Sequence, residues 1–320
     1  MKEKLNHNDN KQLFAVANTL LLYYPTVPSL SFINGRLGIA ALFYEFSEFI
    51  GNDLYKSIAD ETLRELFVKF KTKKIALFNL FELGLGISIL IDKGAISADF
   101  KSFLKEIDRL LSTFNAEIAQ NIQDNSQLSW IGMYILVSTR LLGSSKTDLI
   151  GKALDIYEKF NGFTHLTTLE VNALLYFLTN ILTIKKYNNK AFNLLKKIDD
   201  DIFSSFQKSL DYDYKILVKA FETEEFNISH YLPNLINELK KNSSEYDNID
   251  IFSKESLHSF IFGSTVRTEE LNLDISIAIE KRQSRIMDAD FQINNGLAGI
   301  GIAILNSKKY NESPVYKIAD

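Results

Sequence analysis

The chain of 320 residues contains no cysteine and only four histidines. The absence of cysteine excludes disulfides, thiolate nucleophiles and every zinc site that uses sulfur. The imidazoles are His7, His165, His230 and His258, so a metal site would need these few side chains or carboxylates. Thiol chemistry by the protein's own side chains is therefore excluded.

Proline and glycine are also scarce, with 4 and 14 residues, and long apolar runs are missing. No apolar run reaches the roughly 18 to 20 residues that span a bilayer, and residues 1–9 lack the apolar core of a signal peptide. The net charge is −4 with both signs interspersed, so no single-sign face is available for nucleic acid or an anionic membrane. We therefore expect a cytoplasmic protein with no nucleic-acid partner and no membrane insertion.

Apolar residues recur at spacings of three and four along most of the chain, which is the period of helices. One example is the set Leu104, Ile107, Leu110 and Leu111. No Gly- or Pro-rich linker and no low-complexity tract interrupts this pattern. The sequence predicts an all-α protein with a single domain over residues 1–320.

A small-residue motif recurs along the chain. Asn34–Leu42 reads NGRLGIAAL, and Asn295–Ala303 reads NGLAGIGIA near the other end. Between them Leu83–Leu90 and Ile131–Leu136 carry glycine in the same register, at steps of about 45 to 50 residues. Weaker copies follow within residues 171–263. A repeat of this length predicts one helical pair per copy.

Each copy predicts two helices of different character. The first is short, apolar and rich in small residues and must be buried on all sides, whereas the second is amphipathic, as in Asp53–Leu63. About seven such pairs can stack into an open solenoid or into a closed ring of inner and outer helices. The likeness of the first and last copies favours the closed ring, because a solenoid has polar caps at its ends. Residues 11–24 then form an outer helix beside the last pair.

The Gly-x-x-Gly motif followed by Ile-Ala-x-Leu resembles the repeats of the lanthionine synthetase C-like (LanC-like) family. The segment NGLAGIG at 295–301 resembles that family's last repeat, and the likeness covers most of the chain. It implies an α/α toroid, a closed ring of about seven inner/outer helix pairs. Catalytic members close thioether rings in peptides by adding a zinc-bound cysteine thiol to a dehydrated serine or threonine. The glycines that carry the motif here are Gly35, Gly38, Gly84, Gly86, Gly296 and Gly299.

The sequence departs from this family at the zinc ligands, which in catalytic members are two cysteines and a histidine. Tyr212 stands near an expected cysteine, and His258 stands near the expected histidine as a relict ligand. A lone imidazole does not hold zinc. Because the zinc ligands of the family are missing here, we expect no bound metal and no other cofactor. Without a metal, a substrate thiol stays mostly protonated near neutral pH.

Two other positions match the family's pattern. His165, in the sequence GFTHL, corresponds to a histidine that acts in proton transfer, and Asp124 corresponds to an aspartate ahead of the third inner helix. The resemblance implies that they face one cavity and act as general base and general acid. The alternative for His165 is a polar residue at a helix start with local hydrogen bonds.

Other features favour structural roles. The glycines let inner helices begin tightly and approach one another. Trp130, beside Gly132, is expected to pack in the core, although it could instead line the mouth of the ring and stack on a peptide or sugar. The run Asp199–Asp201 is expected to be a solvated helix face, because consecutive helical residues point in different directions.

The leading hypothesis is a LanC-like protein of peptide modification in a lanthipeptide-type pathway, without zinc-dependent thioether cyclase activity. Its partners would be a precursor peptide, a peptide dehydratase or both. The alternative is a glycan-processing hydrolase on an (α/α)6 barrel, with paired carboxylates drawn from Asp124, Glu170 and Asp213. A third hypothesis is a scaffold without catalysis. The sequence leaves open whether the chain is an enzyme.

Overall fold

A computed structural model of the chain describes residues 7–72, 79–97, 100–114, 126–142, 146–160, 163–204, 215, 218, 228–241, 260–261 and 296–306. Every regular element in these parts is helical, so the prediction of an all-α protein is confirmed for them. The α-helices are α1 (His7–Tyr23), α2 (Arg36–Ile50), α3 (Asp53–Lys71), α4 (Asn79–Asp92), α5 (Lys101–Thr113), α7 (Trp130–Leu142), α8 (Thr147–Lys159), α9 (Thr168–Ile181), α10 (Asn188–Ile198), α12 (Pro233–Lys241) and α15 (Leu297–Asn306).

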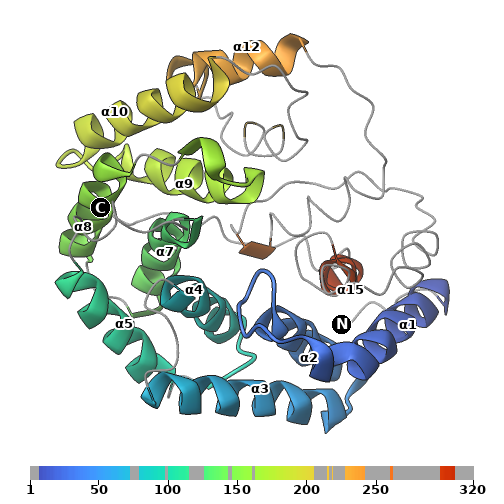
Figure 1. Ribbon diagram of the computed structural model, residues 1–320. Helices are drawn as coiled ribbons and strands as arrows, with labels where there is room; N and C mark the ends of the chain where they lie inside the picture. Colours follow the sequence, from blue (N-terminus) through green and yellow to red (C-terminus); the bar gives the residue numbers. More distant parts are fainter. Residues whose placement is uncertain are drawn as a thin grey trace.

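The helices form an outer and an inner set (Figure 1). The helices α3, α5, α8, α10 and α12 lie at the periphery, and α2, α4, α7, α9 and α15 lie inside them. Along the inner set, α15 contacts α2, α2 contacts α4, α4 contacts α7, and α7 contacts α9. The last inner helix therefore lies beside the first. The prediction of an outer helix from residues 11–24 is confirmed by α1 for its contact with the last inner helix, α15.

The inner helices are buried around most of their circumference. In α4 every residue from Leu80 to Leu90 is buried, and α7 is buried from Trp130 to Ser138. Trp130 therefore packs in the core, as the sequence predicts. A helix that is apolar on all sides needs neighbours on all sides, and the outer helices complete that environment.

The outer helices bury one face and expose the other. The N-cap of α3 is Asn52, whose side-chain oxygen accepts the N–H of Leu54 at 2.9 Å. From there apolar residues recur at helical spacing on the face that contacts α2. The buried apolar residues of α3 are Tyr55, Ala59, Leu63 and Leu66. This helix has the amphipathic character that the sequence predicts for the second helix of a pair.

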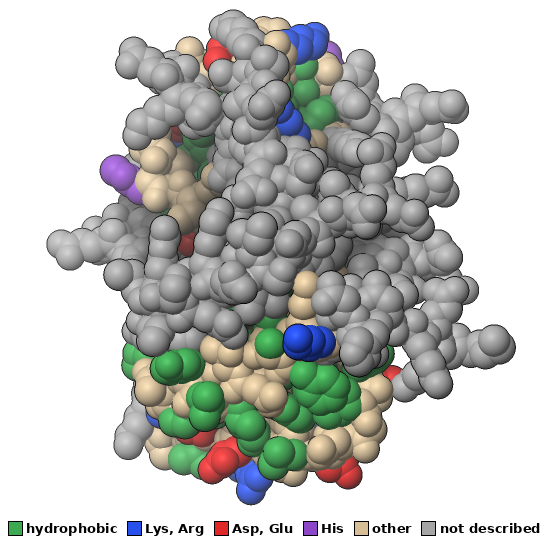
Figure 2. Space-filling model, turned by 90° about the vertical axis from the view of Figure 1, so that its right-hand side faces the viewer, with side chains coloured by type: hydrophobic (Ala, Val, Ile, Leu, Met, Phe, Trp, Pro, Cys, Tyr) green, Lys and Arg blue, Asp and Glu red, His purple; other side chains and the backbone are tan. Residues whose placement is uncertain are grey.

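Among the described residues most large apolar side chains are buried, and one cluster of them contains residues from Leu13 to Leu305. Exceptions are Phe14 and Leu22 in α1 and Leu54 in α3, which are exposed. Figure 2 views the side of the molecule on which α1 lies and shows hydrophobic side chains on its lower part. Within the described ranges, none of the helices combines the length and the apolarity needed to cross a membrane.

Candidate functional site

The glycines of the first and last motif copies lie at the beginning of inner helices. Gly35 is the N-cap of α2, and Gly38 lies in the first turn of that helix. Gly296 directly precedes α15, and Gly299 lies in its first turn. All four are buried. The prediction that the motif opens an inner helix is confirmed for these two copies.

The same prediction is wrong for the second copy. Gly84 and Gly86 lie inside α4, which already begins at Asn79. The residues before them, Leu80 and Phe81, are apolar and buried, so the inner helix continues toward its N-terminus instead of starting at the glycines. These two glycines therefore serve packing and not helix initiation.

Glycines inside the inner helices mark places where a neighbouring inner helix comes close. A Cβ atom at Gly84 would lie 2.9 Å from the ring of Tyr134 in α7. A Cβ atom at Gly301 in α15 would lie 2.7 Å from Cδ2 of Leu42 in α2. Such distances are shorter than real carbon–carbon contacts, so only the missing side chain permits this approach. The interpretation of the glycines as close-packing residues is confirmed at these positions.

The segment of residues 29–35, which leads into α2, is folded tightly against the inner helices. A Cβ atom at Gly35 would lie 2.6 Å from both the carbonyl oxygen of Ser29 and the nitrogen of Ser31, so a side chain there would collide with the backbone. The N–H of Arg36 donates to the carbonyl of Ser29 at 2.9 Å and closes the loop. Its buried apolar side chains are Leu30, Phe32 and Ile33.

Glu82 in α4 holds this segment in place. The residue is only 5% exposed, and its carboxylate accepts the N–H of Ile33 at 2.6 Å. Burial raises the pKa of Glu82, while hydrogen bonds from the Ile33 N–H, the Ser31 hydroxyl and the Phe32 N–H oppose the rise. One carboxylate is thus a shared acceptor for several donors of one short segment. The signal in the sequence for this contact is a single acidic residue, Glu82, within the apolar run 80–90, which the sequence analysis does not single out.

Phe32 makes an aromatic contact between this segment and the inner helices. Its ring fills the space left open by Gly86, where a Cβ atom would lie 2.6 Å from Cδ2 of Phe32. The ring also stacks on that of Phe260, with centroids 6.3 Å apart. Lys93 lies with its Nζ 4.5 Å from the Phe260 centroid and forms an ion pair of 3.7 Å with Glu45 of α2. The segment, α2 and α4 therefore meet around two stacked phenylalanines and the ion pair of buried Glu45 with the more exposed Lys93.

His165 is exposed at the end of the short 3-10 helix η4 (Phe163–His165). Its predicted partner Asp124 lies outside the described residues, so no distance relates the two side chains. Their assignment as general base and general acid stays a prediction. Three further candidate positions, Tyr212, Asp213 and His258, also lie outside the described residues.

Glu170, a candidate for glycan chemistry, caps its own helix. The N–H and the hydroxyl of Thr167 donate to the Glu170 carboxylate at 2.8 and 2.9 Å, and the Glu170 N–H donates to the Thr167 hydroxyl at 3.4 Å. This reciprocal arrangement is a capping box at the start of α9. The negative charge of Glu170 also contributes to the raised pKa of Glu82.

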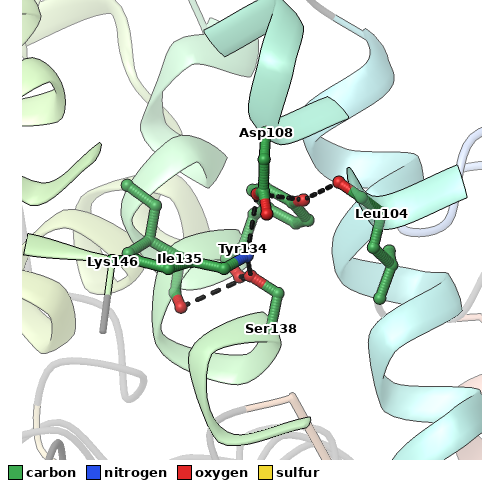
Figure 3. Close-up of polar contacts among 6 residues, drawn as sticks. All are labelled: Leu104, Asp108, Tyr134, Ile135, Ser138 and Lys146. Carbon is green, nitrogen blue, oxygen red and sulfur yellow. Dashed lines mark hydrogen bonds and ion pairs between the residues drawn. The ribbon is translucent and has the colours of Figure 1, made fainter. Parts of the chain in front are cut away.

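A second buried polar cluster joins α5, α7 and the start of α8 (Figure 3). The Nζ of Lys146 donates to Asp108 and to the Ser138 hydroxyl, each at 2.7 Å. The Tyr134 hydroxyl lies 2.7 Å from the same carboxylate and 2.8 Å from the carbonyl of Leu104. The Lys146 side chain is 3% exposed, so its donors point inward to protein acceptors. This cluster fastens three helices together.

Asp108 compensates the positive charge of the buried Lys146 side chain. Burial lowers the pKa of Lys146, and the hydrogen bond and charge of Asp108 oppose that change. Burial and the Asp108 carboxylate both keep the pKa of Tyr134 well above its ordinary value. The ammonium ion therefore depends on Asp108 for compensation, and the tyrosine remains a neutral donor over the physiological range.

The expectation of a solvated face for Asp199–Asp201 is wrong for Asp199. This side chain is buried and accepts the N–H groups of Asn234 and Leu235 at 2.9 and 3.0 Å, at the start of α12. Free N–H groups at a helix start attract a carboxylate, and burial raises its pKa. Asp200 and Asp201 are exposed, as expected.

No cluster of three or more histidine, aspartate or glutamate side chains suited to a metal ion occurs in the described parts of the chain. His258 lies outside those parts, so the expectation of no bound zinc stays a prediction. Comparisons with protein-family models, curated proteins and solved structures gave no match. The likeness to the LanC-like family therefore depends on the motifs of the sequence.

Proposed function

We propose that the chain is a LanC-like α/α toroid, in which about seven inner/outer helix pairs form a closed ring. The observation that carries this proposal is the use of motif glycines at contacts between neighbouring inner helices, as at Gly84 and Gly301. The contact order α15, α2, α4, α7 and α9 supports it as well, because the ends of the repeat meet at α15 and α2.

The function proposed with this fold is peptide modification in a lanthipeptide-type pathway, in the cytoplasm. The chain would bind a precursor peptide, a peptide dehydratase or both, without acting as a zinc-dependent thioether cyclase. The absence of cysteine supports the last point, because thiolate ligands are what a zinc site of this family uses to activate a substrate thiol.

In this role the protein would bind and orient the peptide and would not activate the nucleophile. A free thiol has a pKa of about 8.5, so near neutral pH only a few per cent is thiolate. Thioether formation would then need a separate catalyst or the slow reaction of the peptide itself. The peptide-modification role follows by analogy with the fold. The Glu82 carboxylate is an example of a side-chain acceptor that can bind a backbone N–H.

A synthetic peptide with one dehydroalanine and one cysteine tests the catalytic part. After incubation with the protein and zinc, the free thiols are counted by alkylation and mass spectrometry, with a peptide that carries serine in place of dehydroalanine as control. We expect the dehydroalanine peptide to lose thiol no faster with the protein than without it, and the serine peptide to keep all of its thiol. Loss of thiol from the dehydroalanine peptide alone, with catalytic turnover, would show a cyclase and overturn the proposal.

Co-expression tests the partner part of the proposal. The tagged chain is produced together with the precursor peptide and dehydratase encoded near its own gene, and the purified complex is analysed by mass spectrometry. We expect at least one of the two to co-purify in stoichiometric amount. A gene neighbourhood without a dehydratase, or purification of the chain alone, would contradict a role in this pathway.

A further inference from the structure

We propose that α4 carries a peptide-binding site formed by Glu82 and Gly86, and that residues 29–35 fill this site as an internal strap. The ligand that would replace the strap is a peptide with an aromatic side chain followed by a residue with a free backbone N–H. The inference rests on the proposed function only for the source of that peptide, a precursor peptide.

The first half of the site recognises peptide backbone. The Glu82 carboxylate is buried and accepts the Ile33 N–H at 2.6 Å, and the Phe32 N–H also donates to it. A hydrogen bond between a backbone N–H and a buried carboxylate is charge-assisted and does not depend on side-chain identity. Glu82 can therefore hold any chain that presents adjacent N–H groups in the same way.

The second half of the site selects an aromatic side chain. Gly86 leaves a gap one helical turn after Glu82, and the Phe32 ring fills it. Phe260 forms one wall by stacking on the Phe32 ring with centroids 6.3 Å apart, and the Lys93 ammonium lies 4.5 Å from the centroid of the Phe260 ring. The spacing of carboxylate and gap matches an aromatic residue followed directly by an N–H donor.

Two features of the strap would let it leave α4 as a unit. Pro28 just before it, and Ser29 and Asn34 within it, are exposed. The strap also carries its own hydrogen bonds: the Ser31 N–H donates to the Ser29 hydroxyl, and the Asn34 N–H donates to the Ser31 hydroxyl, both at 3.1 Å. These bonds can persist when the strap leaves α4, so opening breaks the contacts with Glu82, Gly86 and Phe260 and exposes the buried Leu30 and Ile33.

Native-state hydrogen exchange tests whether the strap opens. In the intact protein we expect the Ile33 amide to exchange by local opening, at least about tenfold faster than the amides of Ile39 and Leu42 in α2. Glu82→Leu should speed Ile33 exchange by a further factor of about ten, because the charge-assisted acceptor is lost. Glu82→Gln keeps an acceptor oxygen and should change the rate by less than about threefold.

The α2 amides are the internal reference, because their exchange in each of the three proteins reports any change in global stability against which the Ile33 rate is compared. Exchange of Ile33 at the rate of Ile39 and Leu42 in the unaltered protein would overturn the strap, because residues 29–35 would then open only on global unfolding. This measurement does not depend on whether the Glu82→Leu protein folds.

Peptide binding tests the site itself. The probe is a fluorescent, N-acetylated peptide with the sequence of residues 30–34, LSFIN, added to a Phe32→Ala protein whose gap is empty. We expect saturable binding, and at least about tenfold weaker binding for the same peptide N-methylated at the isoleucine, which cannot donate to Glu82.

Equal binding of the two peptides, or binding of neither, would overturn the site. Because the probe has the strap's own sequence, this result is independent of the precursor peptide and the dehydratase. A failure here is therefore distinguishable from a failure of the proposed function.

Discussion

Gly132 of α7 lies directly against Phe177 of α9, so closely that a Cβ atom on Gly132 would be 2.3 Å from Cγ of the phenylalanine ring. The same relationship joins Gly84 to Tyr134 and Gly301 to Leu42, on other pairs of inner helices. Since both partners are buried in each pair, neither has free space in which to move away. The repeated glycine therefore sets the spacing of the inner helices.

Gly132→Ala tests this packing. The added methyl group must displace the buried Phe177 ring, so we expect a loss of about 1 to 3 kcal/mol in the free energy of unfolding, measured in urea. The control is Gly151→Ala in the outer helix α8, where the nearest atom is the Tyr187 hydroxyl at 3.3 Å. There the helix-propensity gain of about 0.5 to 1 kcal/mol should offset the mild contact. Equal effects of the two substitutions would contradict the packing role.

The buried ion pair of Lys146 with Asp108 should matter far more than an ion pair on the surface. Removing one partner of a buried pair leaves an uncompensated charge and lowers the free energy of unfolding by about 3 to 5 kcal/mol. We expect a decrease of this size for Asp108→Asn, because Lys146, whose side chain is 3% exposed, then has no anionic partner in the pair. The control is the more exposed pair of Lys190 and Asp155, in which Lys190 also pairs with Glu158, so Asp155→Asn should cost less than about 1 kcal/mol.

A double-mutant cycle with Lys146→Met supplies the interaction energy of the buried pair. The double variant should be more stable than Asp108→Asn alone, because it no longer buries an ammonium ion without a carboxylate partner. Additive effects of the two single substitutions would mean that the two side chains do not interact.

Alkaline pH should unfold the protein through its buried tyrosines. Burial raises the pKa of Tyr24 to about 12 and also raises the pKa of Tyr44, Tyr134 and Tyr157. The unfolded chain has tyrosines of pKa about 10, so above that pH it releases protons that the folded chain keeps. The stability that these groups contribute is thus present below pH 10 and is lost as the pH rises further.

The measurement is urea unfolding at several pH values, with tyrosinate absorbance at 295 nm followed in parallel. We expect the unfolding midpoint to fall above about pH 10, and tyrosine ionisation to accompany unfolding. Ionisation of all tyrosines with a midpoint near pH 10 while the protein stays folded would contradict the burial of these four rings.

An engineered disulfide tests the contact between the two ends of the repeat. The chain has no cysteine of its own, so Leu42→Cys with Gly301→Cys introduces one pair without background. The close approach of the Leu42 side chain to the Gly301 position predicts a bond on mild oxidation, seen as a gel-mobility shift that a reductant reverses. The single variants are the controls. Two free thiols in a folded, oxidised double variant would contradict the contact of α2 with α15.

The helix pairs could be predicted because their signals are local. The spacing of Tyr55, Ala59 and Leu63 in α3 is visible in a few turns of sequence, and so is the apolar character of α4. The position of α1 beside α15 followed from the likeness of the first and last motif copies. Local patterns of this kind indicate whether a helix is apolar on all sides or amphipathic. Their repetition along the chain then indicates which helices belong to the inner set and which to the outer set.

The buried polar contacts could not be predicted in the same way. Asp199, Lys146 and Glu82 bind partners that are 35, 38 and 49 residues away. Each looks in the sequence like a surface charge or an isolated exception, and only the packing of helices brings its partner close. The roles of His165 and Asp124 are predictions from motif likeness.

The proposal of a LanC-like ring without its metal chemistry is tested most directly by the zinc content of the intact protein. The chain is produced in zinc-supplemented medium, dialysed against zinc-free buffer and analysed by elemental mass spectrometry against protein concentration. We predict no more zinc than in the dialysis buffer, because the chain has no thiolate ligand. One zinc ion retained per chain would contradict the proposal and would place a working metal site in this protein.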